Sequence, residues 1–400
     1  MKLKSLIITS ALLLAACGYT QAQSTQVIAH RGFWKTDGSA QNSIAALVKA
    51  DSINCYGSEF DVWLTADNQL VVNHDSTFKG VNMQKSTAQQ CTAVILDNGE
   101  QLPTLILFLF GHTLNMFSQV SIEKLSESYY EIVLNGQKML IDAGCGGRIV
   151  SLKSNRHELL LQDSINPINY GSTLWLSPQN WGWPPPAILD RGRYSVRIEN
   201  NSLMLSSEVD DLMKCKIEKT IHPVVEDTSF VIEYKLINES DVILKYAPWE
   251  VTRVPTGGIT FFPEGPAGGK RLSKLNIIKH EGIVWFYFDP LLVNDHQKLF
   301  YNGKEGWLAH QTNNLLFIKQ YPDIGYEQEA PGETEVELYI HKDRTYMELE
   351  IQGEYVSLSP KDTTVWKVCW FLREKQNKIG TDDERKKVLF YVRGLVNGKK

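Results

Sequence analysis

The second part of the chain, from about residue 120 onward, alternates apolar and polar residues in short runs. Successive side chains of a strand point to opposite faces, so this period of two predicts strands with one buried face. The hairpin Tyr129–Asp142 is the sharpest example, because its two alternating runs flank Asn135-Gly136, a dipeptide typical of two-residue turns. Further strands are predicted at Gly147–Leu152, Tyr194–Glu199, Ser229–Ile237, Ile283–Phe288, Leu315–Gln320, Glu335–Ile340, Thr345–Gln352 and Val365–Leu372. Long helical periodicity is absent, so we expect a mostly β chain with a large antiparallel sandwich over residues 120–400.

A different pattern occupies residues 25–105, where three apolar, strand-like runs end in histidine or carry two carboxylates. The runs are Val27–Gly32, Gly57–Val62 and Leu70–Asp75. Glu59 and Asp61 are two positions apart, so in an extended strand both carboxylates face the same way. Such a pair suits Mg²⁺ or Ca²⁺, which prefer oxygen ligands. The spacing therefore predicts a site for a divalent cation.

His30 and His74 lie at the ends of two of these runs. A histidine titrates near neutral pH, so one ring can accept a proton while the other donates one. Arg31 can bridge two phosphate oxygens. Any one of these residues alone has an ordinary structural explanation, but the ordered set of His-Arg-Gly, Glu-x-Asp and His-Asp is specific. Acid, base and metal-binding groups of this kind are what metal-assisted cleavage of a phosphodiester needs.

In this order the motifs resemble those of the glycerophosphodiester phosphodiesterases. The resemblance implies a barrel-type, PLC-like (β/α) fold, hydrolysis of a phosphoric diester in lipid metabolism, and a divalent cation, Ca²⁺ or Mg²⁺. It also implies acid and base roles for His30 and His74, with Arg31 beside them in the catalytic site. Glu59 and Asp61 are the implied metal ligands.

Two features of this segment depart from that family. Gln41-Asn42 stands where the family usually has Glu-Asn, and a third metal carboxylate is not found. A complete barrel needs roughly 250 residues, whereas Thr25–Leu105 can hold only the first three βα units. We therefore expect a partial phosphodiesterase domain over residues 25–105, with weak or lost activity.

The start of the chain predicts export. Two early lysines precede the apolar run Leu6–Ala16, which is too short to span a membrane, so residues 1–22 form a predicted signal peptide. The Leu-Ala-Ala sequence before Cys17 resembles a bacterial lipoprotein signal, which would make Cys17 the lipidated first residue. The alternative is ordinary cleavage after Ala22. Both alternatives predict a protein of the bacterial periplasm, the first as an outer-membrane lipoprotein.

The junction between the two parts, residues 106–119, has an unusual composition. Leu105–Phe110 is apolar on every side and again too short for a transmembrane helix. Two interpretations stay open. The run is either a buried strand with its loop, or the remnant of a second leader where two exported proteins have been joined.

The strand-rich part resembles the galactose-mutarotase-like supersandwich proteins over roughly Ser121–Arg373. The resemblance is carried, in order, by Gly144–Val150, Leu174–Gln179, Pro248–Glu250 and Tyr346–Glu350. In the mutarotases a glutamate acts as base and two histidines serve the sugar. By position Glu348 matches the glutamate, and Glu350 is a second candidate on the same strand face. The histidines do not carry over, because Trp175 and Pro248-Trp249 stand in their place.

The residues that remain still suit a sugar, because indole faces pack on a pyranose ring and carboxylates accept its hydroxyl groups. The carbohydrate-binding candidates are Trp175, Trp181, Trp183, Trp249, Glu250, Glu348 and Glu350. The alternative for the tryptophans is packing in the core. We expect a structural role for His222, His280, His310 and His341.

Composition limits the partners. A chain of 400 residues with 43% hydrophobic and 22% charged residues is globular and long enough for two or three domains. The net charge of −5 without a basic run excludes nucleic acid as the expected partner. We expect a small molecule, a glycerophosphodiester or a sugar, and membrane contact only through a lipid anchor. Three functions stay open: a phosphodiesterase, a carbohydrate-binding or epimerase sandwich, and a non-catalytic envelope interaction protein.

Overall fold

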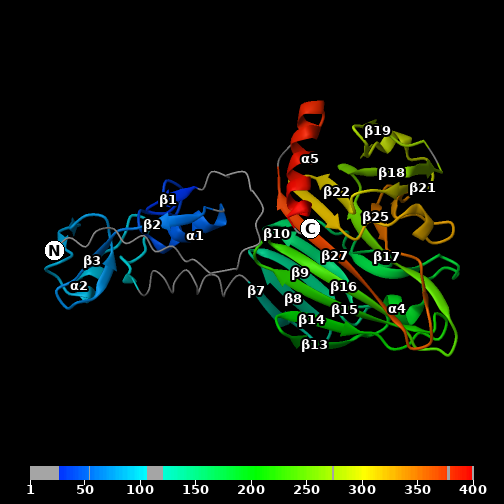
Figure 1. Ribbon diagram of the computed structural model, residues 1–400, viewed down its shortest axis with the longest axis horizontal. Helices are drawn as coiled ribbons and strands as arrows, with labels where there is room; N and C mark the ends of the chain where they lie inside the picture. Colours follow the sequence, from blue (N-terminus) through cyan, green and yellow to red (C-terminus); the bar gives the residue numbers. More distant parts are fainter. Residues whose placement is uncertain (1–26, 54, 106–119, 273, 376–378, 399–400) are drawn as a thin grey trace, which may run out of the picture. The chain divides into compact units, whose positions relative to one another are not determined.

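The computed structural model describes residues 27–53, 55–105, 120–272, 274–375 and 379–398. The chain divides into two compact units, residues 1–118 and residues 119–400. The leader with Cys17 and the apolar junction of residues 106–119 lie outside the described residues. Figure 1 labels the elements of both units.

The first unit begins with one βαβ crossover and continues with two short hairpins. Strands β1 and β2 are parallel, and helix α1 connects them. Its elements are β1 (Ile28–His30), α1 (Ile44–Ser52), β2 (Gly57–Glu59), β3 (Val62–Leu64), β4 (Leu70–Val72), β5 (Thr77–Phe78), β6 (Val81–Asn82) and α2 (Ala88–Thr92). In this part of the chain the structure shows one βαβ unit, where the length left room for three βα units.

The N-terminus of helix α1 is capped by one residue next to it in the sequence and by one residue far from it. The Ser43 hydroxyl accepts the backbone N–H of Ala46 at 3.0 Å. The Glu100 carboxylate accepts the N–H groups of Ile44 and Ala45 at 3.0 and 3.2 Å. Unpaired N–H groups and the helix dipole both favour a negative charge at this end. Glu100 therefore ties the last described loop of the unit to its first helix.

The surface of the first unit carries large apolar side chains. Ile28, Tyr56 and Leu64 are 56%, 59% and 47% exposed. In the described residues β1 and β2 form a sheet of only two strands. A closed barrel pairs all its strands and covers the sheet with helices. The described residues of this unit therefore do not form a closed barrel.

The second unit is a large antiparallel sheet that folds over into two facing layers, nearly barrel-shaped (Figure 1). The first sheet has the order β7 (Val120–Lys124), β8 (Tyr129–Leu134), β9 (Gln137–Asp142), β10 (Arg148–Ser154), β12 (Ser172–Ser177), β17 (Leu244–Pro255), β25 (Tyr346–Gln352), β24 (Val336–Ile340) and β21 (Gln297–Gly303). The second sheet has the order β13 (Ser195–Glu199), β14 (Ser202–Ser206), β15 (Cys215–Val224), β16 (Ser229–Asn238), β27 (Thr363–Glu374), β23 (Leu315–Gln320), β22 (Trp307–Thr312), β18 (Ile259–Arg271), β20 (Ile283–Tyr287) and β19 (Ile277–His280). Strand β18 also pairs with β21 and so joins the two sheets.

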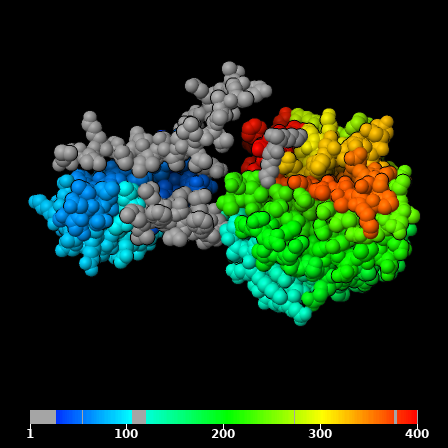
Figure 2. All heavy atoms as spheres, turned by 60° about the horizontal axis from the view of Figure 1, so that its bottom comes forward, coloured from blue at the N-terminus to red at the C-terminus, as the bar shows by residue number. Residues whose placement is uncertain are grey.

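One core fills the space between the two sheets and takes side chains from both. In the space-filling view, the early strands of this unit (cyan and green) and the later ones (yellow and orange) cover different sides of it (Figure 2). Shorter elements complete the unit: β11 (His157–Glu158), β26 (Val356–Leu358), α4 (Ala187–Arg191) and the 3₁₀ helices η1 (Pro290–Leu292) and η2 (Tyr326–Gln328).

The predicted fold class is confirmed, with the Asn135-Gly136 hairpin as its clearest element. Its strands are Tyr129–Leu134 and Gln137–Asp142, and both turn residues have the positive φ that this turn needs. The expected absence of a long helix is wrong. Helix α5 (Asp382–Asn397) begins at a capping box of Thr381 and Glu384.

Helix α5 covers the outer side of the second sheet, where it buries an apolar stripe. The stripe consists of Val388, Leu389, Val392 and Val396, and it packs in one cluster with Trp285 and Phe371. Charged residues dominate the first turns of the helix and an exposed Phe390 interrupts its polar side, which hides the helical period in a strand-rich sequence. None of the helices in the described ranges is long and apolar enough to cross a membrane.

Candidate functional site

In the first unit, pairing of β1 with β2 brings four of the five predicted site residues together. His30 lies opposite Glu59 in the parallel register, and His30 Nε2 is 3.7 Å from Glu59 Oε2. Arg31 Nε is 3.7 Å from Asp61 Oδ2. The histidine side chain is 69% exposed, so the site is open to solvent.

The backbone around Arg31 explains the His-Arg-Gly motif. Gly32 has φ +79°, and a Cβ there would lie 2.6 Å from the Ala46 Cβ of helix α1. Only glycine allows this close approach. Arg31 also has a positive φ of 61°, and its Nη1 donates to Gln41 Oε1 at 2.8 Å. Gln41, at the position that departs from the phosphodiesterase pattern, therefore orients the arginine.

His74 follows β4 and is bound to its neighbour, with Nδ1 2.8 Å from Asp75 Oδ1. The Asn73 N–H donates to the Asp61 carbonyl at 3.0 Å, which places His74 one residue beyond the Asp61 backbone. The His74 side chain is 43% exposed. The end of β4 thus reaches the same region as the carboxylate pair.

The carboxylates fit a divalent cation only in part. Glu59 Oε2 and Asp61 Oδ2 are buried atoms without a hydrogen-bond partner, and such oxygens can serve as ligands. In the described chain, however, no group of three or more His, Cys, Asp or Glu side chains could hold a metal ion. The residues present supply two ligands, and water would have to supply the others.

In the second unit, the strand registers collect polar side chains on one face of the first sheet. Across β17, β25, β24 and β21, Arg253 lies opposite Glu348, Glu348 opposite Tyr339, and Tyr339 opposite Lys298. Residues two positions away share this face. We call it the polar face: Trp175, Trp249, Arg253, Lys298, Glu337, Tyr339, His341, Tyr346, Glu348, Glu350 and Gln352.

Charges on the polar face are paired and mostly buried. Lys298 Nζ lies 2.7 Å from Glu337 Oε2 and 3.3 Å from Glu350 Oε2. Trp249 Nε1 donates to Glu350 Oε2 at 2.9 Å. Burial raises the pKa of Glu350 to about 7, although the Lys298 charge opposes the rise. Burial also raises the pKa of Glu337.

Arg253 has spare hydrogen-bonding capacity. Its Nε donates to Glu348 Oε1 at 2.8 Å, and its guanidinium lies over the Trp175 ring at 4.9 Å. Both terminal nitrogens, Nη1 and Nη2, are buried without a hydrogen-bond partner. A buried donor without a partner is costly, so these nitrogens are suited to bind an acceptor.

Part of the polar face is accessible, as is Trp183 beside it. Trp183 is 57% exposed, and the side chains of Glu348, Lys298 and His341 are 11%, 19% and 20% exposed. We call these four residues the open end. Trp183 meets the edge of the Trp175 ring at 6.0 Å.

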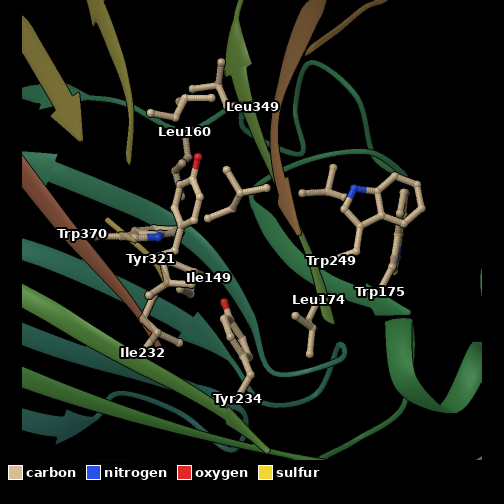
Figure 3. Close-up of a cluster of buried hydrophobic side chains, with 14 of the residues drawn as sticks. Ile149, Leu160, Leu174, Trp175, Ile232, Tyr234, Trp249, Tyr321, Leu349 and Trp370 are labelled. Atoms are coloured by element: carbon tan, nitrogen blue, oxygen red, sulfur yellow. The ribbon is translucent and has the colours of Figure 1, made fainter. Parts of the chain in front are cut away.

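Trp175, Trp181 and Trp249 lie behind the open end. They are only 7%, 6% and 1% exposed. The rings of Trp175 and Trp249 are 5.4 Å apart and lie side by side in Figure 3. The Trp181 indole donates to the Leu176 carbonyl at 2.9 Å. These three tryptophans are therefore packed in the interior, and Trp183 alone among the predicted tryptophans has an exposed ring.

Glu250 lies on the opposite face of β17, in the core between the sheets. It is fully buried, and its Oε1 is 2.9 Å from Lys319 Nζ of the second sheet. Tyr234 and Trp370, both labelled in Figure 3, also donate to this carboxylate, at 2.6 and 3.1 Å. Glu250 is therefore separated from the polar face by its own strand.

The structure also adds residues that sequence reasoning missed. Arg253, Lys298, Glu337, Tyr339 and Tyr346 were not selected, although Glu335–His341 and Tyr346–Gln352 alternate polar and apolar residues throughout. Most polar side chains of these two strands are buried. Each strand therefore has two buried faces, one apolar and one polar. The alternation of polar and apolar residues in these two segments was the sequence feature that could have identified the missed residues.

His341 of the polar face has a second histidine, His296, beside it. His341 stacks on Tyr346 with ring centres 4.9 Å apart, and it meets His296 edge-on at 5.2 Å. His296 Nδ1 in turn contacts the Tyr339 hydroxyl. The other histidines lie elsewhere: His310 is buried against the Thr260 hydroxyl at 2.9 Å, and burial lowers its pKa to about 4.

Comparison with known proteins finds both resemblances that the sequence predicted. No family model and no curated protein match the chain. The chain matches a crystal structure of a glycerophosphodiester phosphodiesterase from Parabacteroides distasonis, with 53% identity over 23% of this chain and a TM-score of 0.22. It spans 38% of the length of that protein.

The sandwich matches solved structures over a larger part of the chain. A galactose mutarotase related enzyme from Lactobacillus acidophilus is 11% identical over 63% of this chain and all of its own length, with a TM-score of 0.45. A TPR-domain containing protein from Parabacteroides distasonis is 14% identical over 63% of this chain and 48% of its own, with a TM-score of 0.47.

Proposed function

We propose that the second unit is a carbohydrate-binding domain that takes a sugar at the open end of the polar face. The observation that carries this proposal is the exposed Trp183 ring at the edge of Trp175, whose own ring lies under the Arg253 guanidinium that pairs with Glu348. An aromatic face can pack on the sugar ring, while charged groups bind its hydroxyls. The buried Arg253 nitrogens would supply further donors at the floor of the site.

Binding should depend more on the aromatic ring than on the carboxylate. We expect Trp183→Ala to weaken the affinity for the bound sugar about tenfold, because the ring supplies contact area, and Glu348→Gln to weaken it less. A thermal-shift screen of monosaccharides and of plant and host glycans would identify the ligand, and calorimetry would measure each variant.

Phe390→Ala is the matched control, because Phe390 is 84% exposed on helix α5 and should leave affinity unchanged. A screen without any hit would favour the envelope interaction protein, in which the sandwich serves only as a partner surface. Equal affinity of the wild type and Trp183→Ala would show that the sugar binds elsewhere.

A sugar epimerase is the second candidate for this unit. The observation that favours it is the group of His296, His341 and Tyr339 beside Glu348, because catalysis of anomer exchange needs a base and an acid. Exchange of the two anomers can be followed by NMR. Fast exchange that Glu348→Gln abolishes would establish the epimerase, and unchanged exchange would leave binding alone.

We further propose that the first unit is a partial phosphodiesterase domain that binds one Ca²⁺ or Mg²⁺ weakly through Glu59 and Asp61. Both cations normally take six or more oxygen ligands, and this pair supplies only two side chains. When bound, the cation would stabilise negative charge on a phosphodiester, while His30 and His74 would accept protons from and donate protons to the reacting groups of that phosphodiester.

Calorimetric titration with CaCl₂ or MgCl₂ should give weaker binding for Glu59→Ala than for the wild type. Equal heats would contradict this site.

For the cell, we propose export by the signal of residues 1–22, with a lipid on Cys17. The support is the sequence pattern alone. The intact mass of the mature protein from its bacterial host separates the alternatives. A diacylglycerol-modified chain that starts at Cys17 supports the lipoprotein, a chain that starts after Ala22 supports a free periplasmic protein, and an unprocessed chain contradicts both.

A further inference from the structure

Oxygen-bearing side chains gather where β21 ends and β24 begins, near η2. Asn302 and Glu335 are only 2% and 0% exposed, and Glu329 is half-buried in the loop after η2. Asn302 Nδ2 donates to Glu329 Oε1 at 3.1 Å, and the Glu335 backbone N–H donates to the same oxygen at 3.1 Å. These two bonds hold the three residues together.

Two oxygens of this group lack a full set of partners. Glu335 Oε1 accepts the Ile324 N–H at 2.9 Å, whereas the buried Glu335 Oε2 has only the Gly303 amide beside it, and the buried Asn302 Oδ1 has no hydrogen-bond partner among the described residues. Buried polar atoms in native proteins almost always have a partner, which is protein, water or an ion. Two such oxygens in one group indicate a missing ligand.

The backbone beside these oxygens is formed by glycines that leave room for them. A Cβ on Gly303 would lie 2.3 Å from Glu335 Oε2. A Cβ on Gly265 would lie 2.2 Å from Asn302 Oδ1 and 2.1 Å from the Gly303 carbonyl oxygen. The Asn302 amide oxygen and the Gly303 carbonyl oxygen therefore both lie against Gly265, where a Cβ would collide with backbone, and Glu335 Oε2 lies against the neighbouring Gly303.

Among the described residues, the two carboxyl groups of the corner lack a cationic partner. In the part of the chain that the structure describes, neither Glu329 nor Glu335 forms an ion pair, and Lys298 is already paired with two other glutamates. Burial raises the pKa of Glu335 to about 8. Hydrogen bonds from neighbouring backbone amides oppose this rise in the pKa, and the negative charges of Asp323 and Glu329 add to it. A bound cation would favour the ionised form instead.

We propose that Glu335, Glu329 and Asn302 form a binding site for a calcium ion. Ca²⁺ takes six to eight oxygen ligands, including carboxylates, amide oxygens, backbone carbonyls and water, and its geometry is flexible. This mixed set agrees with the finding that no three His, Cys, Asp or Glu side chains in the described chain form a metal cluster. The half-buried Glu329 gives the ion a route from solvent. The site uses none of the four residues of the open end and neither Glu59 nor Asp61.

The test uses the full chain with Glu59→Ala and Asp61→Ala, so that the first unit contributes no cation binding. After treatment with EDTA, calorimetric titration with CaCl₂ should show one Ca²⁺ per chain, and the melting temperature should rise with calcium. In this background Glu335→Gln should weaken calcium binding at least about tenfold. Glu354→Gln, at an exposed position, is the matched control and should bind calcium normally.

Asn302→Asp is a second variant with the opposite expected sign. It replaces an amide oxygen with a carboxylate, so calcium affinity should rise while the melting temperature in EDTA falls through added repulsion. The absence of any calcium heat would overturn the proposal, as would unchanged affinity in Glu335→Gln. If Glu335→Gln does not fold, Asn302→Asp decides alone, because an affinity that stays equal or falls overturns the site.

Discussion

Replacement of Lys319 by methionine is expected to lower the free energy of unfolding of the second unit by about 3–5 kcal/mol. Lys319 is fully buried between the two sheets, where its Nζ lies 2.9 Å from Glu250 Oε1 and donates to the Leu349 carbonyl at 2.8 Å. Methionine has a similar volume but no charge, so it leaves the Glu250 carboxylate buried without its cation. Urea denaturation followed by tryptophan fluorescence would measure the change.

Lys367→Met provides the control for this prediction. Lys367 pairs with Glu233 at 3.0 Å, but its side chain is 63% exposed, so the loss should stay within about 1 kcal/mol. The double variant Lys319→Met with Glu250→Gln should recover part of the stability, because it removes the unpaired charge. A loss for Lys319→Met as small as for Lys367→Met would contradict the importance of this ion pair.

Phosphodiesterase activity of the chain is expected to be at least about a thousandfold below the roughly 10 turnovers per second of an ordinary enzyme. His30, Arg31, Glu59 and Asp61 are brought together, but the described first unit does not form a closed barrel, and its strand faces are exposed where a barrel would hold substrate. Loss of positioning commonly costs orders of magnitude in rate. Release of glycerol phosphate from glycerophosphocholine with Mg²⁺ or Ca²⁺ would measure the activity.

His30→Ala distinguishes this residual activity from contamination, because it removes one proposed proton-transfer group and leaves the exposed surface almost unchanged. Wild type and variant should release glycerol phosphate at the same background rate if activity is lost. Turnover near 10 per second that disappears in His30→Ala would show that the partial domain is sufficient for catalysis.

Local rules of the sequence determined the strands of the second unit. The alternation of Tyr129–Asp142 and the Asn135-Gly136 turn act between near neighbours, so the hairpin could be predicted residue by residue. The motifs of the first unit also predicted that His30 and Glu59 lie close together, because a parallel βαβ crossover places His30 opposite Glu59. Helix α5 was not predicted, because its apolar stripe is stabilised by packing on the second sheet, and the sequence does not show that contact.

Only the tertiary structure decided which polar residues act together. Trp249 and Glu250 are adjacent in sequence, yet one lies on the polar face and the other pairs with Lys319 in the core, because a strand alternates its faces. Arg253, Lys298 and Glu348 meet through registers between strands far apart in the chain. A sequence read alone shows the period of each strand, and it does not show which strand is its neighbour, since pairing depends on long-range packing of the whole sandwich.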